Sequence, residues 1–361
     1  MQFSEAERLF RNEDIRALAA DRGGRLYLKL RSLSRSEYLV RLLNQEGVLT
    51  SGSKSKELFQ AAYAAGIAET RIDTFIKAIY KEERKGRLAK EGDLVSELYK
   101  LEVFDWGGLH QNSLEKTIVD NYIKKISKYE QLEEAIEGEL QHSLRGYVLC
   151  SWYNHWTSIL IEDVFRDHEN VLPAIGQVKK IDFFVRNTPF DLKVTYLPEG
   201  YVSDKRKSAT QRPELTLLKG CAREFDLPFD NEMPNSRLLE DLWKKVSDHP
   251  NRKCQRLIGD VKAFRSAIID EIRGDPTDLI TWLYENQGVR RFDASNRLFL
   301  VLVDTDDFFG SWKLKRALPR LKEGVCRYLD GVPAKPGHEV VFQWEGTPYS
   351  ARSDAVLVTK P

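Results

Sequence analysis

The chain has few of the features that mark membrane proteins or disulfide-stabilised proteins. It contains no run of eighteen apolar residues that could span a bilayer, and it does not begin with the charged start and apolar run of a signal peptide. Its four cysteines are scattered without paired spacing, so neither a zinc site nor a disulfide framework is indicated: Cys150, Cys221, Cys254 and Cys326. We therefore expect a soluble, cytoplasmic protein without membrane contact.

Excess charge of either sign is also missing. The 361 residues include 56 Lys and Arg against 55 Asp and Glu, which gives a formal net charge of +1. Many nucleic-acid-binding proteins are strongly basic, so any such surface in this chain must be local. The chain also lacks a Gly-rich phosphate loop and a serine nucleophile elbow, and ATP-driven or covalent mechanisms therefore have no support. A hydrophobic content of 42% is enough for two domains with cores.

What the chain does have is a predicted β-hairpin over residues 178–196. Strand periodicity places its apolar side chains on one face and directs Asp182, Asp191 and Lys193 to the other. If the turn consists only of Arg186 and Asn187, Asp182 lies directly opposite Asp191, with the side chains about 5 Å apart. One divalent cation could bridge two carboxylates at that separation, whereas a longer loop would make the pair diagonal.

Two aspartates that face each other repel, and a hard, oxygen-binding cation such as Mg²⁺ is the natural neutraliser. A simpler interpretation is a half-exposed hairpin whose charged face is solvated, with Lys193 paired to a neighbouring carboxylate. The strongly apolar flanking strands and a further acid upstream favour the metal site.

The upstream acid lies on a predicted helix over residues 143–168. This segment is apolar nearly all round, as expected of a buried helix, but Glu162 falls on a narrow polar strip together with Ser151, His155 and Ser158. Asp163 falls instead beside Trp152, Trp156 and Ile159. Glu162 is therefore the predicted site acid, and Asp163 is the alternative.

In their order and types these residues resemble the PD-(D/E)xK nuclease superfamily, which includes the type II restriction endonucleases. Asp182 matches the first acid of the motif, Asp191 and Lys193 match the D-x-K, and Glu162 matches the acid often supplied by the first core helix. Ile181 stands where the motif usually has proline, and the gap between Asp182 and Asp191 is short.

The resemblance implies an α/β fold, with a restriction-endonuclease-like mixed sheet flanked by helices over residues 115–361. It also implies a magnesium-dependent type II site-specific deoxyribonuclease, which hydrolyses phosphodiester bonds of double-stranded DNA. Mg²⁺ would be held by the carboxylates of Asp182, Asp191 and Glu162 and by the backbone carbonyl of Leu192, with Lys193 positioning the attacking water. A restriction enzyme of this kind would act as a homodimer beside a cognate methyltransferase.

The sequence downstream of the hairpin agrees with that fold. Residues 296–304 form a near-continuous apolar run, which is typical of a strand buried on both faces. A helix is predicted over about residues 310–329, followed by strands over residues 339–344 and 353–359. This order of elements predicts a mixed sheet with helices on its faces.

Residues 1–110 are rich in helix formers and predict a separate helical domain, which ends in a turn-prone junction at residues 104–112. The exposed start of one of its helices would present Arg71, Thr74 and Lys77 to DNA. That prediction depends on spacing typical of a helix-turn-helix, or of the related winged helix, at Ala62, Gly66, Ile67, Ile72 and Phe75. The alternative is an ordinary helical hairpin used for packing or dimerisation.

A basic cluster follows the hairpin and is a second candidate for DNA contact, at phosphates flanking the cut: Lys205, Arg206, Lys207 and Arg212. Three other functions remain open. The chain could be a repair or anti-phage defence nuclease of the same superfamily without a fixed recognition sequence. It could also be a non-catalytic helix-turn-helix DNA-binding protein, or an assembly module whose N-terminal helices dimerise.

Overall fold

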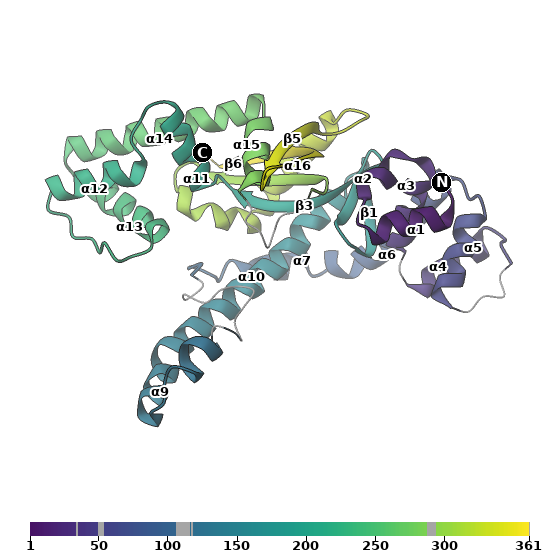
Figure 1. The fold of residues 1–361 in the computed structure, drawn as a ribbon, viewed down its shortest axis with the longest axis horizontal. Coiled ribbons are helices and arrows are strands. Elements are labelled where there is room, and N and C mark those ends of the chain that lie inside the picture. The colour runs from purple at the N-terminus through teal and green to yellow at the C-terminus, as the bar shows by residue number, and fades with distance from the viewer. Residues whose placement is uncertain (34, 50–53, 106–115, 117, 287–293, 361) are drawn as a thin grey trace.

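The computed structural model describes residues 1–33, 35–49, 54–105, 116, 118–286 and 294–360. The protein is of the predicted α/β class, because an N-terminal helical region is followed by a six-stranded mixed sheet with flanking helices (Figure 1). In the part of the chain that the structure describes, no helix is long and apolar enough to cross a membrane. Most of the predicted junction at residues 104–112 lies outside the described residues.

The sheet has the strand order β1-β2-β3-β4-β6-β5. β1–β3 form an antiparallel meander, β4 is parallel to β3 and β6, and β5 is antiparallel to β6. The strands are β1 (Val171–Val178), β2 (Ile181–Val185), β3 (Thr188–Tyr196), β4 (Arg297–Asp304), β5 (His338–Trp344) and β6 (Thr347–Lys360). The sequence predicts all of these strands except β1, whose Pro173 and Gly176 are typical of loops. Proline is tolerated there because β1 is an edge strand.

Helices cover both faces of the sheet. On one face, α10 (Gln141–Arg166) and α16 (Leu318–Gly331) pack on side chains that include Phe183 and Leu300. The other face carries Phe299 and Val301, which pack against the helices inserted between β3 and β4. These are α11 (Glu199–Ser208), α12 (Glu214–Glu224), α13 (Asn235–Asp248), α14 (Arg252–Gly274) and α15 (Thr277–Glu285). Every residue of β4 is buried, as its apolar run predicts.

The helix predicted over residues 310–329 is divided into two elements. A 3₁₀ segment, η3 (Phe308–Arg316), precedes α16, and Pro319 lies in the first turn of α16. Proline has no backbone N–H and clashes with the preceding turn, so it is accepted at the start of a helix but not in its interior. The segment is therefore helical, as predicted, but its first part is 3₁₀ and the α-helix begins at Leu318.

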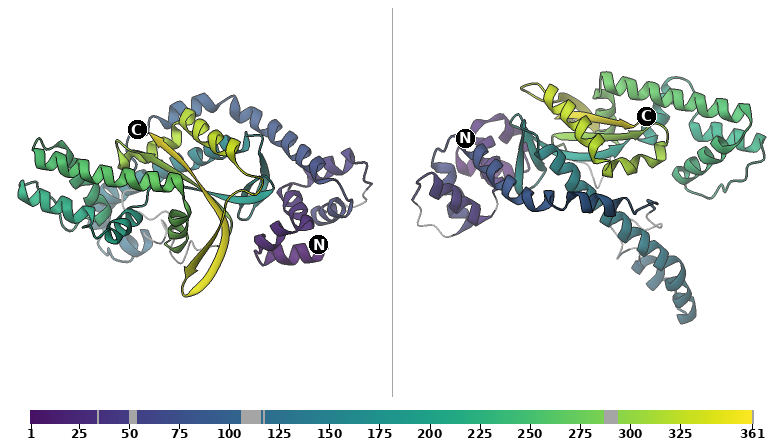
Figure 2. Two further views of the ribbon diagram at one scale, coloured as in Figure 1. Left: turned by 90° about the horizontal axis from the view of Figure 1, so that it is seen from above. Right: turned by 180° about the vertical axis from the view of Figure 1, so that it is seen from behind.

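The N-terminal region is helical, as predicted, and it packs on the edge of the sheet. Leu28 and Ile76 of its helices share one hydrophobic cluster with Leu172 of β1 and Phe184 of β2. Figure 2 shows the first of these helices, in purple, at one end of the sheet and α12–α14 at the other. The N-terminal helices are α1 (Phe3–Arg11), α2 (Ile15–Ala20), α3 (Arg22–Ser32), α4 (Ser36–Gln45), α5 (Ser55–Ala64), α6 (Glu69–Leu88) and α7 (Glu91–Leu98).

The corner predicted from the helix-turn-helix spacing is present between α5 and α6. Gly66 has a φ of +64°, a left-handed conformation that favours glycine, and Ala62 of α5 and Ile72 of α6 are both buried in the core that the N-terminal helices share. A Cβ on Gly66 would meet no atom within 4 Å, so backbone conformation rather than crowding explains the glycine. The apolar side of α6 packs against β1.

The predicted helix over residues 143–168 corresponds to α10, which is the last part of a long helical rod. The rod begins with α9 (Tyr129–Ala135) and passes through a short π-helical segment, η2 (Ile136–Leu140). Its first half projects away from the sheet, with the short segment η1 (Val119–Ile123) against α9 (Figure 1). The second half packs on the sheet and carries Glu162 and Asp163.

Candidate active site

The β2–β3 hairpin has the short turn on which the predicted aspartate pair depends. Val185 pairs with Thr188 and Phe183 with Phe190, so the turn consists of Arg186 and Asn187 alone. Both turn residues have positive φ, 47° and 70°, as expected of the two-residue turn whose twist matches that of the strands. Continued by one residue, this register sets Asp182 opposite Asp191.

Asp182 is held from two sides by the backbone and by a neighbouring arginine. Its Oδ2 atom accepts a hydrogen bond from the Leu192 N–H at 2.7 Å, and its carbonyl oxygen accepts one from Arg166 Nη2 at 3.2 Å. Burial raises the pKa of the Asp182 carboxyl, and the negative charge of Asp191 raises it further. The two carboxylates therefore do repel each other, and a cation between them would relieve that repulsion.

Asp191 and Lys193 point to the same face of β3 and are paired. Lys193 Nζ lies 2.7 Å from Asp191 Oδ1, and Arg297 Nε lies 3.7 Å from Asp191 Oδ2. The side chain of Asp191 is largely buried, whereas that of Lys193 is 45% exposed. Lys193 is thus oriented by a carboxylate while its ammonium group stays accessible to a ligand.

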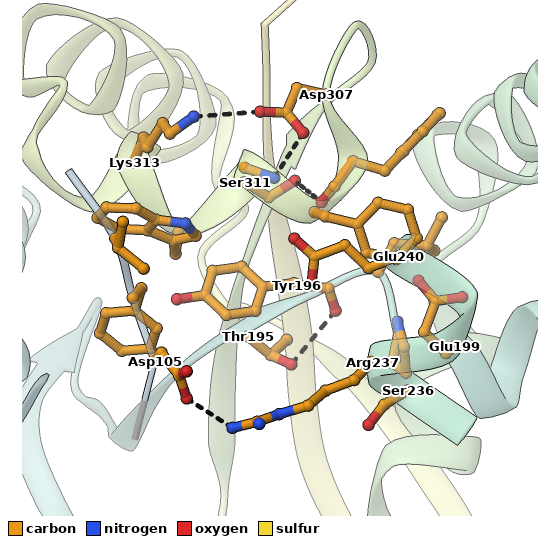
Figure 3. A pocket seen from close by; sticks show the side chains of 18 of the residues that line it. Asp105, Thr195, Tyr196, Glu199, Ser236, Arg237, Glu240, Asp307, Ser311 and Lys313 are labelled. Atoms are coloured by element: carbon orange, nitrogen blue, oxygen red, sulfur yellow. Dashed lines mark hydrogen bonds and ion pairs between the residues drawn. The ribbon is translucent and has the colours of Figure 1, made fainter. Parts of the chain in front are cut away.

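A cavity of about 1110 Å³ opens farther along this face, at the carboxyl ends of β3 and β4 (Figure 3). Thr195 of β3 lines it and shares its face of the strand with Asp191 and Lys193. Five lining residues are acidic and two are basic, and the two bases, Arg237 and Lys313, are paired with Asp105 and Asp307. The surplus of carboxylates makes this cavity unfavourable for a phosphate backbone.

The two candidate acids of α10 point in different directions. Burial raises the pKa of Glu162, and the negative charge of Asp182 raises it further. The Glu162 carboxylate is bound by Arg166, one helical turn later, at 2.8 Å. Arg166 thereby connects Glu162 to the backbone of Asp182. The sequence carries one signal for this arginine, its spacing of four residues from Glu162.

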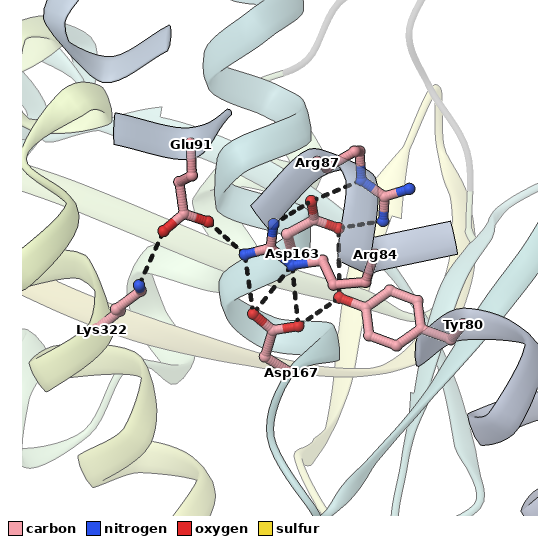
Figure 4. Close-up of polar contacts among 7 residues, drawn as sticks. All are labelled: Tyr80, Arg84, Arg87, Glu91, Asp163, Asp167 and Lys322. Carbon is pink, nitrogen blue, oxygen red and sulfur yellow. Dashed lines mark hydrogen bonds and ion pairs between the residues drawn. The ribbon is translucent and has the colours of Figure 1, made fainter. Parts of the chain in front are cut away.

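Asp163 is buried and belongs to a different group of charges (Figure 4). Arg87 of α6 donates to both of its oxygens, at 2.8 and 2.9 Å, and Tyr80 also contacts it. Arg84 of α6 binds Asp167 in the same way, with Nη2 3.0 Å from Oδ2. Asp163 therefore fastens α6 to α10, and of the two acids Glu162 is the one connected to the hairpin, through Arg166.

The donor groups at the hairpin suit a hard cation only in part. Asp182 and Asp191 supply two facing carboxylates, and the Leu192 carbonyl opens toward Asp182 because the N–H and C=O of a strand residue point to the same side. Glu162 is engaged by Arg166 instead. Over the described residues, no three His, Cys, Asp or Glu side chains are arranged so as to hold a metal ion. The fit thus rests on the aspartate pair and the carbonyl.

The residues predicted to meet DNA at the start of α6 are used mainly within the protein. Arg71 pairs with Glu46 at 2.8 Å, Thr74 Oγ1 donates to the Thr70 carbonyl, and Lys77 Nζ donates to the Glu169 carbonyl. In the same first turns Glu69 and Asp73 bind the fully buried Lys29. Arg71 and Thr74 remain exposed, but the start of this helix is not a basic surface.

The basic cluster at residues 205–212 is likewise tied to its own neighbourhood. Lys205 pairs with Glu271 and Asp278, at 3.0 and 2.8 Å. Arg206 is buried, donates to the Arg212 carbonyl and lies over the Phe264 ring, while Lys207 pairs with Asp204. Only the side chain of Arg212 stays exposed without such a contact among the described residues. This cluster stabilises the helices inserted between β3 and β4.

Comparison of the chain with protein-family models, curated proteins and solved structures found no significant match. The function must therefore be argued from the geometry of the hairpin and its surroundings.

Proposed function

We propose that this protein is a magnesium-dependent endodeoxyribonuclease that hydrolyses phosphodiester bonds of double-stranded DNA in the manner of a type II restriction endonuclease. The observation that carries the proposal is the proximity of Asp182 and Asp191 across the hairpin, with Lys193 two residues after Asp191 and with Glu162 connected to the hairpin through Arg166. The order of a helix, an antiparallel meander and a parallel fourth strand supports it, because that order agrees with the superfamily that the motif resembles.

In this proposal Asp182, Asp191 and the carbonyl of Leu192 would hold Mg²⁺, with Glu162 as a further ligand. The chemistry that magnesium supplies when bound is a lowered pKa of the attacking water and a screened charge on the scissile phosphate. Hard divalent cations prefer oxygen ligands of these types. Arg166 balances the charge of Glu162, so removing Arg166 should leave three carboxylates with less compensation.

Lys193 would act on the phosphate. Its ammonium group is held by Asp191 at 2.7 Å and is partly exposed, so it can orient the attacking water and donate to a phosphate oxygen on which charge grows. Arg297 contacts the other oxygen of Asp191 and keeps the carboxylate in place. As water bonds to phosphorus, the bond to the 3′ oxygen breaks, which leaves a 5′-phosphate end.

A second candidate is a nuclease of the same superfamily without a fixed recognition sequence, acting in repair or anti-phage defence. The contacts at the start of α6 favour it, because Glu69 and Asp73 are committed to Lys29 and Arg71 to Glu46 rather than presented to bases. The same contacts count against a non-catalytic helix-turn-helix protein, which would depend on that surface alone.

The test is to incubate the full chain with plasmid DNA and Mg²⁺ and to sequence the ends. Discrete fragments indicate a restriction enzyme, and a smear indicates the second candidate. Asp182→Ala, Asp191→Ala and Lys193→Ala should each abolish cleavage, whereas Asp248→Ala, which changes an exposed acid far along the chain, should not. Cleavage by Asp182→Ala at the parent rate would refute the site. Binding without cleavage, independent of metal, would instead favour the non-catalytic protein.

A further inference from the structure

A second, smaller cavity has the opposite charge to the large one. It has a volume of about 440 Å³ and lies between α6 and the connection from α10 to β1. Five of its lining residues are basic and two are acidic. The basic residues are Lys77, Lys81, Arg84, Lys85 and Arg166, and we call this cavity the basic groove. Arg84 and Arg166 are paired with Asp167 and Glu162, so the three lysines supply the positive charge that distinguishes this groove.

The lysines of the groove form a straight row along α6. Lys77, Lys81 and Lys85 are spaced by four residues, so they lie on one side of the helix with about 6 Å between successive positions. Lys81 and Lys85 are exposed, and among the described residues neither ammonium makes an ion pair or a hydrogen bond. The row therefore offers positive charge that the described part of the protein does not neutralise.

Two acids near this row, Asp163 and Asp167, are bound by arginines and not by the lysines. Arg84 binds Asp167 and Arg87 binds Asp163, and both arginines come from the same helix as the lysines. These contacts also hold α6 against α10 (Figure 4), where Tyr80 adds a hydrogen bond to Asp167 at 2.7 Å. The lysine row is thus kept in a fixed position relative to the helix that carries Glu162.

The groove is connected to the candidate active site through one of its own walls. Arg166 lines the groove, and its guanidinium group contacts Glu162 Oε2 at 2.8 Å and the Asp182 carbonyl at 3.2 Å. A chain of phosphates that followed the lysine row would therefore pass next to Arg166, which contacts both Glu162 and the backbone of Asp182. The acidic cavity at the ends of β3 and β4 offers no comparable route.

We propose that Lys81 and Lys85 form a phosphate-binding track that guides the backbone of duplex DNA along α6 to the site at Asp182 and Asp191. The row from Lys77 to Lys85 is about 12 Å long, and one strand of B-DNA presents three to four phosphates over roughly that distance. The protein would meet DNA with the side of α6, not with its first turn. The choice of DNA as partner rests on the proposed function; the track itself rests on charge and position.

The test is a binding experiment with the full chain carrying Asp182→Ala, in a buffer with chelator, so that cleavage does not interfere. Affinity for short mixed-sequence duplexes is measured between about 50 and 200 mM salt. Adding Lys81→Ala and Lys85→Ala should reduce the slope of log affinity against log salt by about 2. At about 0.1 M salt that corresponds to a loss of affinity of up to about 60-fold, equal for all sequences.

The matched control is Lys244→Ala with Lys335→Ala, two exposed lysines that do not line the groove. This variant should keep the affinity and salt slope of the Asp182→Ala protein. Unchanged affinity and slope in the Lys81→Ala and Lys85→Ala variant would overturn the track, and so would an equal loss in the control. Tighter binding of a duplex RNA probe than of DNA would overturn the choice of partner.

Failure of the track and failure of the proposed function give different results. If the parent binds DNA through these lysines but does not cleave it with Mg²⁺, the track stands and the nuclease function fails. If the parent cleaves DNA and the lysine variant binds and cleaves as the parent does, the function stands and the track fails. Both lysines are exposed, so their removal should leave the urea midpoint of unfolding unchanged.

Discussion

Replacing each of two adjacent acids of α10 by alanine should separate stability from catalysis. Asp163 is buried and bound by Arg87 and Tyr80, and loss of one partner from a buried ion pair costs about 3–5 kcal/mol. Arg87 is 35% exposed and can regain water, and the buried Arg84, which lies 3.5 Å from Asp163, keeps its contact with Asp167; we therefore expect Asp163→Ala to lower the free energy of unfolding by a reduced amount, about 2–3 kcal/mol. Glu162 is 28% exposed, and its one ion pair within the described residues is with Arg166, so Glu162→Ala should cost less than about 1 kcal/mol.

Catalysis should follow the reverse order. Glu162→Ala should slow magnesium-dependent nicking of plasmid DNA, whereas Asp163→Ala should cleave normally under conditions where it is folded. Urea unfolding, followed by the fluorescence of the seven tryptophans, gives the stability of both variants. Arg87→Ala is the control. Because Arg87 and Asp163 are partners, the double variant should lose less stability than the sum of the losses in the two single variants. A stable, inactive Asp163→Ala variant beside an active Glu162→Ala variant would refute the assignment.

Two further predictions concern the aspartate pair and the α5–α6 corner. Burial, and after it the charge of Asp191, raises the pKa of Asp182 in the folded protein above its ordinary value of 3.8. The folded protein therefore loses stability as the pH rises from 3.8 through this raised pKa, because the Asp182 carboxyl becomes charged. Asp182→Asn should therefore be more stable than the parent at pH 7 but not near pH 4. Mg²⁺ should raise the melting temperature of the parent and not that of the variant. An equal gain in stability at both pH values would contradict the role of the Asp182 charge. Gly66→Ala should cost about 1 kcal/mol because of its positive φ, whereas Gly86→Ala, inside α6, should stabilise by about 0.5–1 kcal/mol. Urea midpoints that shift in the same direction for both glycines would argue against the conformational explanation.

The features that the sequence predicts well are those set by neighbouring residues. The period of two around Asp182 and Asp191 fixes which side chains share a face, and the two-residue turn between them then fixes their register. The apolar run that became β4 is identified without knowledge of its partners, because a short, near-continuous apolar run is typical of a strand covered on both faces. Ala62 and Gly66 likewise indicate a helical corner from spacing alone.

The features that the sequence did not predict depend on contacts between segments that are far apart in the sequence. β1 contains Pro173, which a central strand would exclude but an edge strand accepts, and nothing local shows that this segment lies at an edge. The neighbours of Glu162 and Asp163 in the fold are likewise not apparent from the local sequence. Helical spacing separates the two acids, but the ion pair between Asp163 and Arg87 depends on α6, which is far from α10 in the sequence.

Two basic segments that look alike in the sequence show how this matters for nucleic-acid binding. Lys205 belongs to the denser of the two, yet acids more than sixty residues downstream, Glu271 and Asp278, pair with it in the folded chain. The lysines of α6 are not paired in this way. Arginines of α6 bind the nearby acids of α10, and Lys81 and Lys85 therefore remain unpaired within the described residues. In a chain with almost no net charge, a surface for a polyanion arises only where folding sequesters the acids away from the lysines, and composition cannot show that place.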